Sequence, residues 1–61
     1  MTHQVEIWNR TKATWELLIR VYDEADGKRV IARELKKFAF LSTYGYTVPE
    51  LQHFRVSRVT A

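Results

Sequence analysis

One helix is predicted by residues 23–45, DEADGKRVIARELKKFAFLSTYG. At about 100° per residue, one stripe of this segment faces in a single direction and suits a core; it comprises Ile31, Leu35, Phe38 and Ser42. Asp23 or Asp26 can cap the free amides of the first turn, and Gly45 is a good stop. We therefore expect a helix over residues 24–44 that packs its stripe on a sheet.

Three other segments predict β-strands. Residues 3–8 alternate with the two-residue period of a half-buried strand. Residues 15–22 fit either a strand or a helix, and their β-branched and aromatic content favours the strand. After a proline that keeps the preceding residue extended, residues 53–60 predict the last strand. The polar segment 9–14 connects the first two strands as a loop.

The order of these elements predicts an α+β fold in which residues 1–61 form a single domain. A two-layer β-β-α-β arrangement, with a three-stranded, mainly antiparallel sheet covered on one face by a single helix, buries the apolar side of each element with few residues. A chain of 61 residues buries only roughly 60% of the surface of its unfolded form. An active-site cleft of ordinary size is therefore hard to enclose.

The composition of the chain predicts the cellular compartment in which the protein works. Cysteine is absent, which removes disulfides and thiolate metal sites and makes the reducing cytosol the expected location. The start of the chain has no basic segment followed by an apolar run, and the longest apolar run is FAFL, residues 38–41, far shorter than a membrane span. We expect a soluble, uncleaved chain without a membrane partner.

No catalytic or metal-binding motif is recognisable. His3 and His53 are the only imidazoles, and neither has the neighbours of a metal or nucleophile site. The serines lack the glycines of a nucleophile elbow. The letters DEAD at residues 23–26 match a helicase motif, but no phosphate-binding glycine loop accompanies them. We predict a protein that is not an enzyme and that needs neither a metal nor a cofactor.

Two surfaces remain as candidates for binding. On the helix, opposite the buried stripe, four cations surround two rings: Arg29, Arg33, Lys36 and Lys37 around Phe40 and Tyr44. Aromatic groups within a charged rim are typical of binding hot spots. In the alternative interpretation, the helix is rotated or Phe40 folds down at its edge.

The second surface is the uncovered sheet face. If Leu17, Ile19 and Val21 point toward the helix, alternation leaves rings and cations on the other side: Trp8, Leu18, Arg20, Tyr22, His53 and Arg55. Such a face can stack the bases of single-stranded nucleic acid, dock a partner protein or form a homodimer. The alternative is a set of cross-strand pairs, with Trp8 beside Tyr22, that only shields the sheet.

The last predicted strand and the residues before it resemble part of a known protein family. In the tail YTVPELQHFRVSRV, residues 46–59, Phe54 and Val56 share a side with Arg58, which we expect to lie past the core edge. This tail, together with the element order, resembles the small early protein with which some short-tailed coliphages inhibit host RNA polymerase. The resemblance implies that Arg58 contacts the polymerase. That family has a strongly acidic helix face, whereas the helix face here is basic, which favours an acidic protein or nucleic acid as the target.

Two functional hypotheses follow. In the first, the protein is a phage-derived inhibitor or adaptor in the bacterial host cytosol, and it binds a larger protein or ribonucleoprotein, of the RNA polymerase or CRISPR effector type, as anti-CRISPR proteins do. Its contact residues would be the helix set together with Arg55 and Arg58. In the second, it is a small nucleic-acid-binding module that uses the sheet face. The net charge of +3 is compatible with both.

Overall fold

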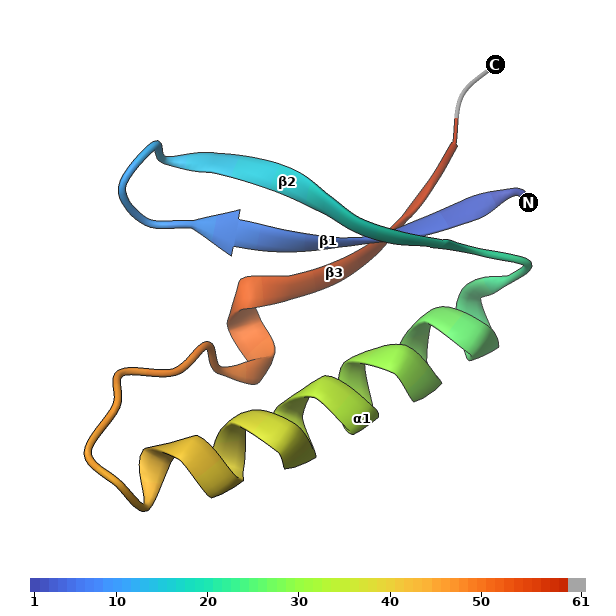
Figure 1. Cartoon of the computed structure of the whole chain (residues 1–61). Helices are drawn as coiled ribbons and strands as arrows, with labels where there is room; N and C mark the ends of the chain where they lie inside the picture. The colour runs from blue at the N-terminus through green and yellow to red at the C-terminus, as the bar shows by residue number, and fades with distance from the viewer. Residues whose placement is uncertain (60–61) are drawn as a thin grey trace.

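The computed structural model describes residues 1–59 and has the predicted order of elements (Figure 1). These elements are β1 (His3–Asn9), β2 (Thr14–Val21), α1 (Glu24–Ser42), the short 3₁₀ helix η1 (Leu51–His53) and β3 (Phe54–Arg58). The helix ends two residues earlier than predicted, and residue 53 belongs to η1 rather than to β3. The end predicted for the last strand, residue 60, lies outside the described residues.

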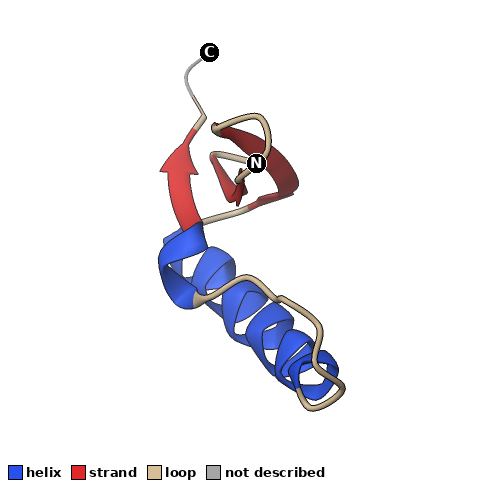
Figure 2. Ribbon diagram, turned by 90° about the vertical axis from the view of Figure 1, so that its left-hand side faces the viewer, coloured by secondary structure: helices blue, strands red, loops and turns tan. Residues whose placement is uncertain are grey.

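The strands form one open sheet with the order β2-β1-β3. β1 lies in the centre and pairs antiparallel with both neighbours, so β2 and β3 run parallel to each other at the two edges. The single helix lies as a second layer against one face of this sheet (Figure 2). The predicted α+β, two-layer β-β-α-β fold is confirmed. No helix within residues 1–59 has the length and apolar composition that crossing a bilayer would require.

The turn between β1 and β2 is closed by a side chain. Asn9 Oδ1 accepts hydrogen bonds from the backbone N–H groups of Thr11 (3.0 Å) and Lys12 (3.1 Å), as an Asx turn does. Ala13 has a positive φ of 53° and brings the chain back into β2. The connection predicted over residues 9–14 is therefore a four-residue hairpin loop between the paired residues Asn9 and Thr14.

A bulge in β2 changes the side of the sheet on which its side chains lie. Val5 pairs with Ile19 and Glu6 with Leu17, so Leu18 is the additional residue. Because cross-strand partners share a face, Leu17 lies on the solvent side with Glu6, where it is 53% exposed. The inward direction predicted for Leu17 is wrong, since the extra residue of a bulge breaks the two-residue period.

The core is small and lies between the sheet and the part of α1 that ends at Phe38. Its buried hydrophobic residues are Val5, Val21, Ile31 and Phe54, and partly buried Ile7, Val30, Leu35, Phe38 and Val56 pack against them. The inward stripe is thus confirmed for Ile31, Leu35 and Phe38. Ser42 is exposed and donates its hydroxyl to the Ala39 carbonyl (3.2 Å), because the C-terminal end of α1 extends away from the strands (Figure 1).

The start of α1 is fixed by a cap and by a close approach to β3. Of the two predicted caps, Asp23 has this role, because its Oδ1 accepts the Asp26 N–H at 2.8 Å. One turn further along, Gly27 is buried against Val56, and a Cβ at residue 27 would lie 2.6 Å from a Val56 methyl carbon. A larger residue at this position would force the helix away from the sheet.

Gly27→Ala is therefore expected to destabilise the protein, although alanine is the better helix former. The helix gains about 1 kcal/mol from the alanine, while forcing an additional methyl into a packed contact costs about 1–3 kcal/mol. Urea unfolding followed by far-UV circular dichroism measures the difference. In a Val56→Ala background, which removes the clashing methyl groups, the same substitution is expected to become neutral or stabilising.

Gly45→Ala is the matched control. Gly45 has a φ of +84° with no atom within 4 Å of an added Cβ, so alanine there costs about 1 kcal/mol of backbone strain alone. That cost is expected to be the same in both backgrounds, because separated sites act additively. If Val56→Ala left the effect of Gly27→Ala unchanged, the close approach would not be the cause.

Candidate binding surfaces

Two exposed rings lie at the C-terminal end of α1, on the side opposite the core: Phe40 is in the last turn of the helix, and Tyr44, predicted to be helical, is in the turn that follows Ser42. Phe40 is 64% exposed and Tyr44 67% exposed, and their centroids lie 5.4 Å apart in an edge-to-face arrangement. The helical spacing of four residues brings them together. The predicted exposure of Phe40 is confirmed, and the alternative in which it folds down at the helix edge is wrong.

The cations around these rings are mostly free. Arg29 is bound to Asp26 one turn earlier on the helix. Arg33, Lys36 and Lys37 are exposed and form no salt bridge within residues 1–59. We call the set Arg33, Lys36, Lys37, Phe40 and Tyr44 the helix face. It combines apolar rings with unpaired positive charge.

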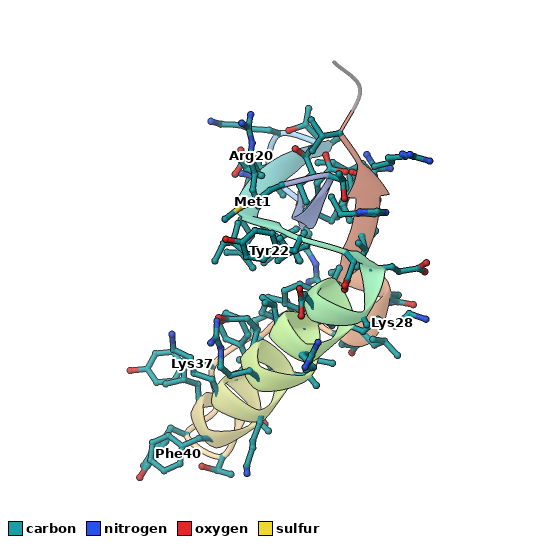
Figure 3. The ribbon with its side chains drawn as sticks, turned by 90° about the vertical axis from the view of Figure 1, so that its right-hand side faces the viewer. Met1, Arg20, Tyr22, Lys28, Lys37 and Phe40 are labelled. Atoms are coloured by element: carbon teal, nitrogen blue, oxygen red, sulfur yellow. The ribbon has the colours of Figure 1, made fainter. Side chains whose placement is uncertain are left out.

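Two residues predicted for the sheet face lie on the same side of the molecule as part of the helix face. Figure 3 shows Arg20 and Tyr22 on the side where Lys37 and Phe40 also lie, whereas Lys28 is on the opposite side of the helix. Tyr22 follows the last residue of β2, and its carbonyl accepts the Thr2 hydroxyl at 2.6 Å. The predicted pair of Trp8 and Tyr22 is wrong, because these residues are at opposite ends of the β1–β2 hairpin.

The partner of Trp8 is Trp15, which the sequence did not place on this surface. The two indoles pack edge to face across β1 and β2, with centroids 5.4 Å apart and planes at 64°. Arg55 of β3 lies with its guanidinium carbon 4.2 Å from the centroid of the Trp15 ring. The pair could have been predicted from the position of the turn, since residues 8 and 15 are equally far from the centre of the four-residue loop and therefore pair in the hairpin.

Arg55 is held in this position by Glu6. Its Nε donates to Glu6 Oε1 at 2.9 Å, and the Ser57 hydroxyl donates to the same oxygen at 2.6 Å. The hydrogen bond from Arg55, followed by that from Ser57, keeps the pKa of Glu6 below its ordinary value of 4.5. The result is an ordered cation over an indole, a cation–π contact.

Two hollows adjoin Trp8. The narrower one, of about 140 Å³, is lined by Trp8, Arg10, Thr47, Val48, Pro49 and His53. The wider and more open one, of about 450 Å³, is lined by Trp8, Trp15, Gln52 and His53. Since Trp8 and His53 line both, the hollows form one groove, which we call the tryptophan groove. His53 Nδ1 accepts the Glu50 N–H at 3.0 Å, so the proton of the neutral ring is on Nε2.

The predicted partner-binding residues therefore do not form one surface. Those of the helix lie together, while Arg55 lies with Trp15 on the opposite face of the sheet. Arg58 is an exposed residue at the end of β3, opposite His3. From the predicted sheet set, Trp8 and His53 line the tryptophan groove, and Leu18 belongs to the bulge of the edge strand. No group of three or more histidine, aspartate or glutamate side chains in residues 1–59 is placed to hold a metal ion.

Comparisons with known proteins identify no relative: no family model, no curated protein sequence and no solved structure shows significant similarity to this chain.

The pairing of Glu6 predicts a pH dependence of stability. A carboxyl whose pKa is lowered by folding contributes stability above its unfolded pKa, and this contribution is lost as the pH falls through the folded pKa. Wild type is therefore expected to lose stability as the pH falls below about 4.5, the ordinary value for this group. Urea unfolding between about pH 7 and pH 3 measures this loss.

Glu6→Gln keeps the size of the side chain and removes its charge. We expect this variant to be less stable than wild type at neutral pH, by about 1 kcal/mol for a partly exposed pair, and to lose less on acidification. Glu24→Gln is the control, since Glu24 only pairs with Lys28 in solvent. Equal acid sensitivity of wild type and Glu6→Gln would contradict the assignment.

Proposed function

We propose that this protein is a non-enzymatic inhibitor or adaptor that binds a larger host assembly through its helix face. The observation that carries the proposal is the exposed pair of Phe40 and Tyr44 beside three cations without acidic partners among the described residues. Rings that are exposed to water in the free protein contribute favourable free energy to binding when a partner covers them, because apolar surface is then removed from water. Such rings are the side chains that dominate binding energies at protein interfaces.

The charge of the helix face favours an acidic partner. Three unpaired cations attract a negative surface and raise the rate of association at low salt. The rings then supply the short-range part of the affinity, which depends on complementary shape. The proposed partner surface is therefore an acidic patch with an apolar depression for Phe40.

The type of assembly is suggested by the resemblance in the last strand. The early phage protein that the tail and element order resemble inhibits host RNA polymerase, and other compact phage inhibitors act on RNA-guided effector complexes, so these two are the proposed classes of partner. Arg58 is exposed at the end of β3 and is proposed as a secondary contact. The encounter is proposed to take place in the bacterial cytosol, where a chain without cysteine needs no oxidising compartment.

Phe40→Ala is expected to weaken binding to such a partner by about thirtyfold, the effect of losing roughly 2 kcal/mol at a hot spot. Biolayer interferometry with purified bacterial RNA polymerase and with a purified RNA-guided effector complex gives the dissociation constants. Charge reversal at Lys37 (Lys37→Glu) is expected to lower the association rate and to make it less dependent on salt.

Tyr46→Ala is the matched control, because Tyr46 is a ring of similar exposure (66%) outside α1. It is expected to leave affinity within about twofold of wild type, the effect usual for residues outside a hot spot. If both complexes bound wild type and Phe40→Ala equally well, or if Tyr46→Ala had the larger effect, the helix face would not be the contact surface.

A further inference from the structure

The tryptophan groove combines aromatic surface with positive charge and has no acidic residue in its lining. Its lining comprises the aromatic residues Trp8, Trp15 and His53, the polar and charged residues Arg10, Thr47 and Gln52, and the apolar residues Val48 and Pro49. The acids near the groove have partners: Glu6 is bound to Arg55, Glu16 is bound to Asn9 and Lys12, and Glu50 accepts a hydrogen bond from the Gln52 amide at 3.3 Å. The groove therefore offers an anionic ligand a cationic end and a flat ligand an aromatic wall.

Arg10 is available for such a ligand. It lies at the start of the hairpin loop, is exposed and forms no salt bridge within residues 1–59. Lys12 lies two residues further along the same loop, at 3.8 Å from Glu16 and largely in solvent. Arg10 thus supplies a positive charge at the groove that has no acidic partner among residues 1–59.

We propose that the tryptophan groove binds single-stranded nucleic acid, with a base against the indole of Trp8 or Trp15 and the adjoining phosphate on Arg10. A nucleotide carries a flat aromatic base close to a negatively charged phosphate. The base matches the indoles of the groove, and the phosphate matches Arg10. Base stacking on exposed aromatic residues with cations along the backbone is the common mode of single-strand binding. A peptide would match the rings but not the positive charge, unless it were itself acidic.

The polar groups of the groove can contact the edge of a base. Because His53 Nδ1 accepts the Glu50 N–H, the donor of this ring is Nε2. The Gln52 amide donates one N–H to Glu50 Oε2 at 3.3 Å and keeps a second N–H and a carbonyl oxygen. Arg55 has a different role. Because it is bound to Glu6 and lies against Trp15, it fixes the indole and adds positive potential without having to reach the phosphate.

This site is independent of the proposed function. The tryptophan groove is built from β1, β2, the hairpin loop between them, η1 and the loop that precedes η1, whereas the helix face is built from α1 from Arg33 onward and the turn that follows it. Substitutions on the helix face therefore serve as controls for the groove. Failure of one proposal has no bearing on the other.

The test uses two labelled oligonucleotides of about ten residues, an oligothymidylate and an oligouridylate, in fluorescence anisotropy titrations with the full chain. Arg10→Glu is expected to weaken binding by about tenfold and to make the dependence of log K on log salt shallower, since single strands lose about 0.7 in slope per phosphate contact. Trp8→Leu is expected to weaken binding by about fivefold or more. Circular dichroism verifies that Trp8→Leu is folded.

Arg33→Glu is the matched control, because it makes the same change of charge on the helix face. It is expected to retain the wild-type affinity within about twofold. The chain contains only two tryptophans, so quenching of the wild-type fluorescence by either oligonucleotide reports the groove directly. The arm that binds more tightly distinguishes DNA from RNA.

Three results would overturn the proposal. The first is that neither oligonucleotide binds at about 50 mM salt, where phosphate contacts are strong. The second is that Arg33→Glu weakens binding as much as Arg10→Glu, which would indicate attraction to the net charge alone. The third is that an acidic or proline-rich peptide quenches the tryptophan fluorescence when the oligonucleotides do not, which would make the groove a peptide site.

Discussion

The structure depends on the close contact between the first half of α1 and β3. Gly27 has no side chain, so the helix backbone approaches Val56, and Ile31 then reaches the core beside Phe54. Because this end of the helix is fixed and the helix is nearly straight, the C-terminal end of α1 diverges from the strands (Figure 1). Phe40 is exposed because of this geometry as well as because of its position around the helix.

The helix was predictable because its signal is local and repeated. A stripe at the helical period assigns Ile31 to the core and Phe40 to solvent whatever the rest of the chain does, and the structure agrees on both. The same period also assigned Ser42 to the core, but Ser42 is exposed. Periodicity gives the direction of a side chain around the helix, but it does not tell how far along the helix the sheet extends. That depends on the tertiary arrangement.

The strands were predictable as elements, but the faces of β2 were not. The two-residue alternation predicts the correct face for Ile19 and Val21, which follow the bulge, and the wrong face for Leu17, which precedes it. Ile19 shares the face of Val5 but is 41% exposed on the edge strand and is not part of the core. A bulge reverses the direction of every side chain on one side of it, and no single residue in this segment marks its position. Trp15 therefore went unassigned, and with it the pair with Trp8 that forms the wall of the groove.

The accessible surface of this thin domain is large for its mass, which links binding to stability. The accessible surface is 4773 Å², against about 4,200 Å² expected for a compact chain of 7.3 kDa, and the radius of gyration is 12.1 Å rather than about 10.5 Å. The difference of about 600 Å² is about three quarters of the roughly 800 Å² that each partner contributes to an ordinary interface. A partner that covers the helix face would bury apolar area that the small core cannot. Binding and stability are therefore expected to be linked in this protein, and the exposure of Phe40 and Tyr44 is a cost to the free chain that a complex would remove.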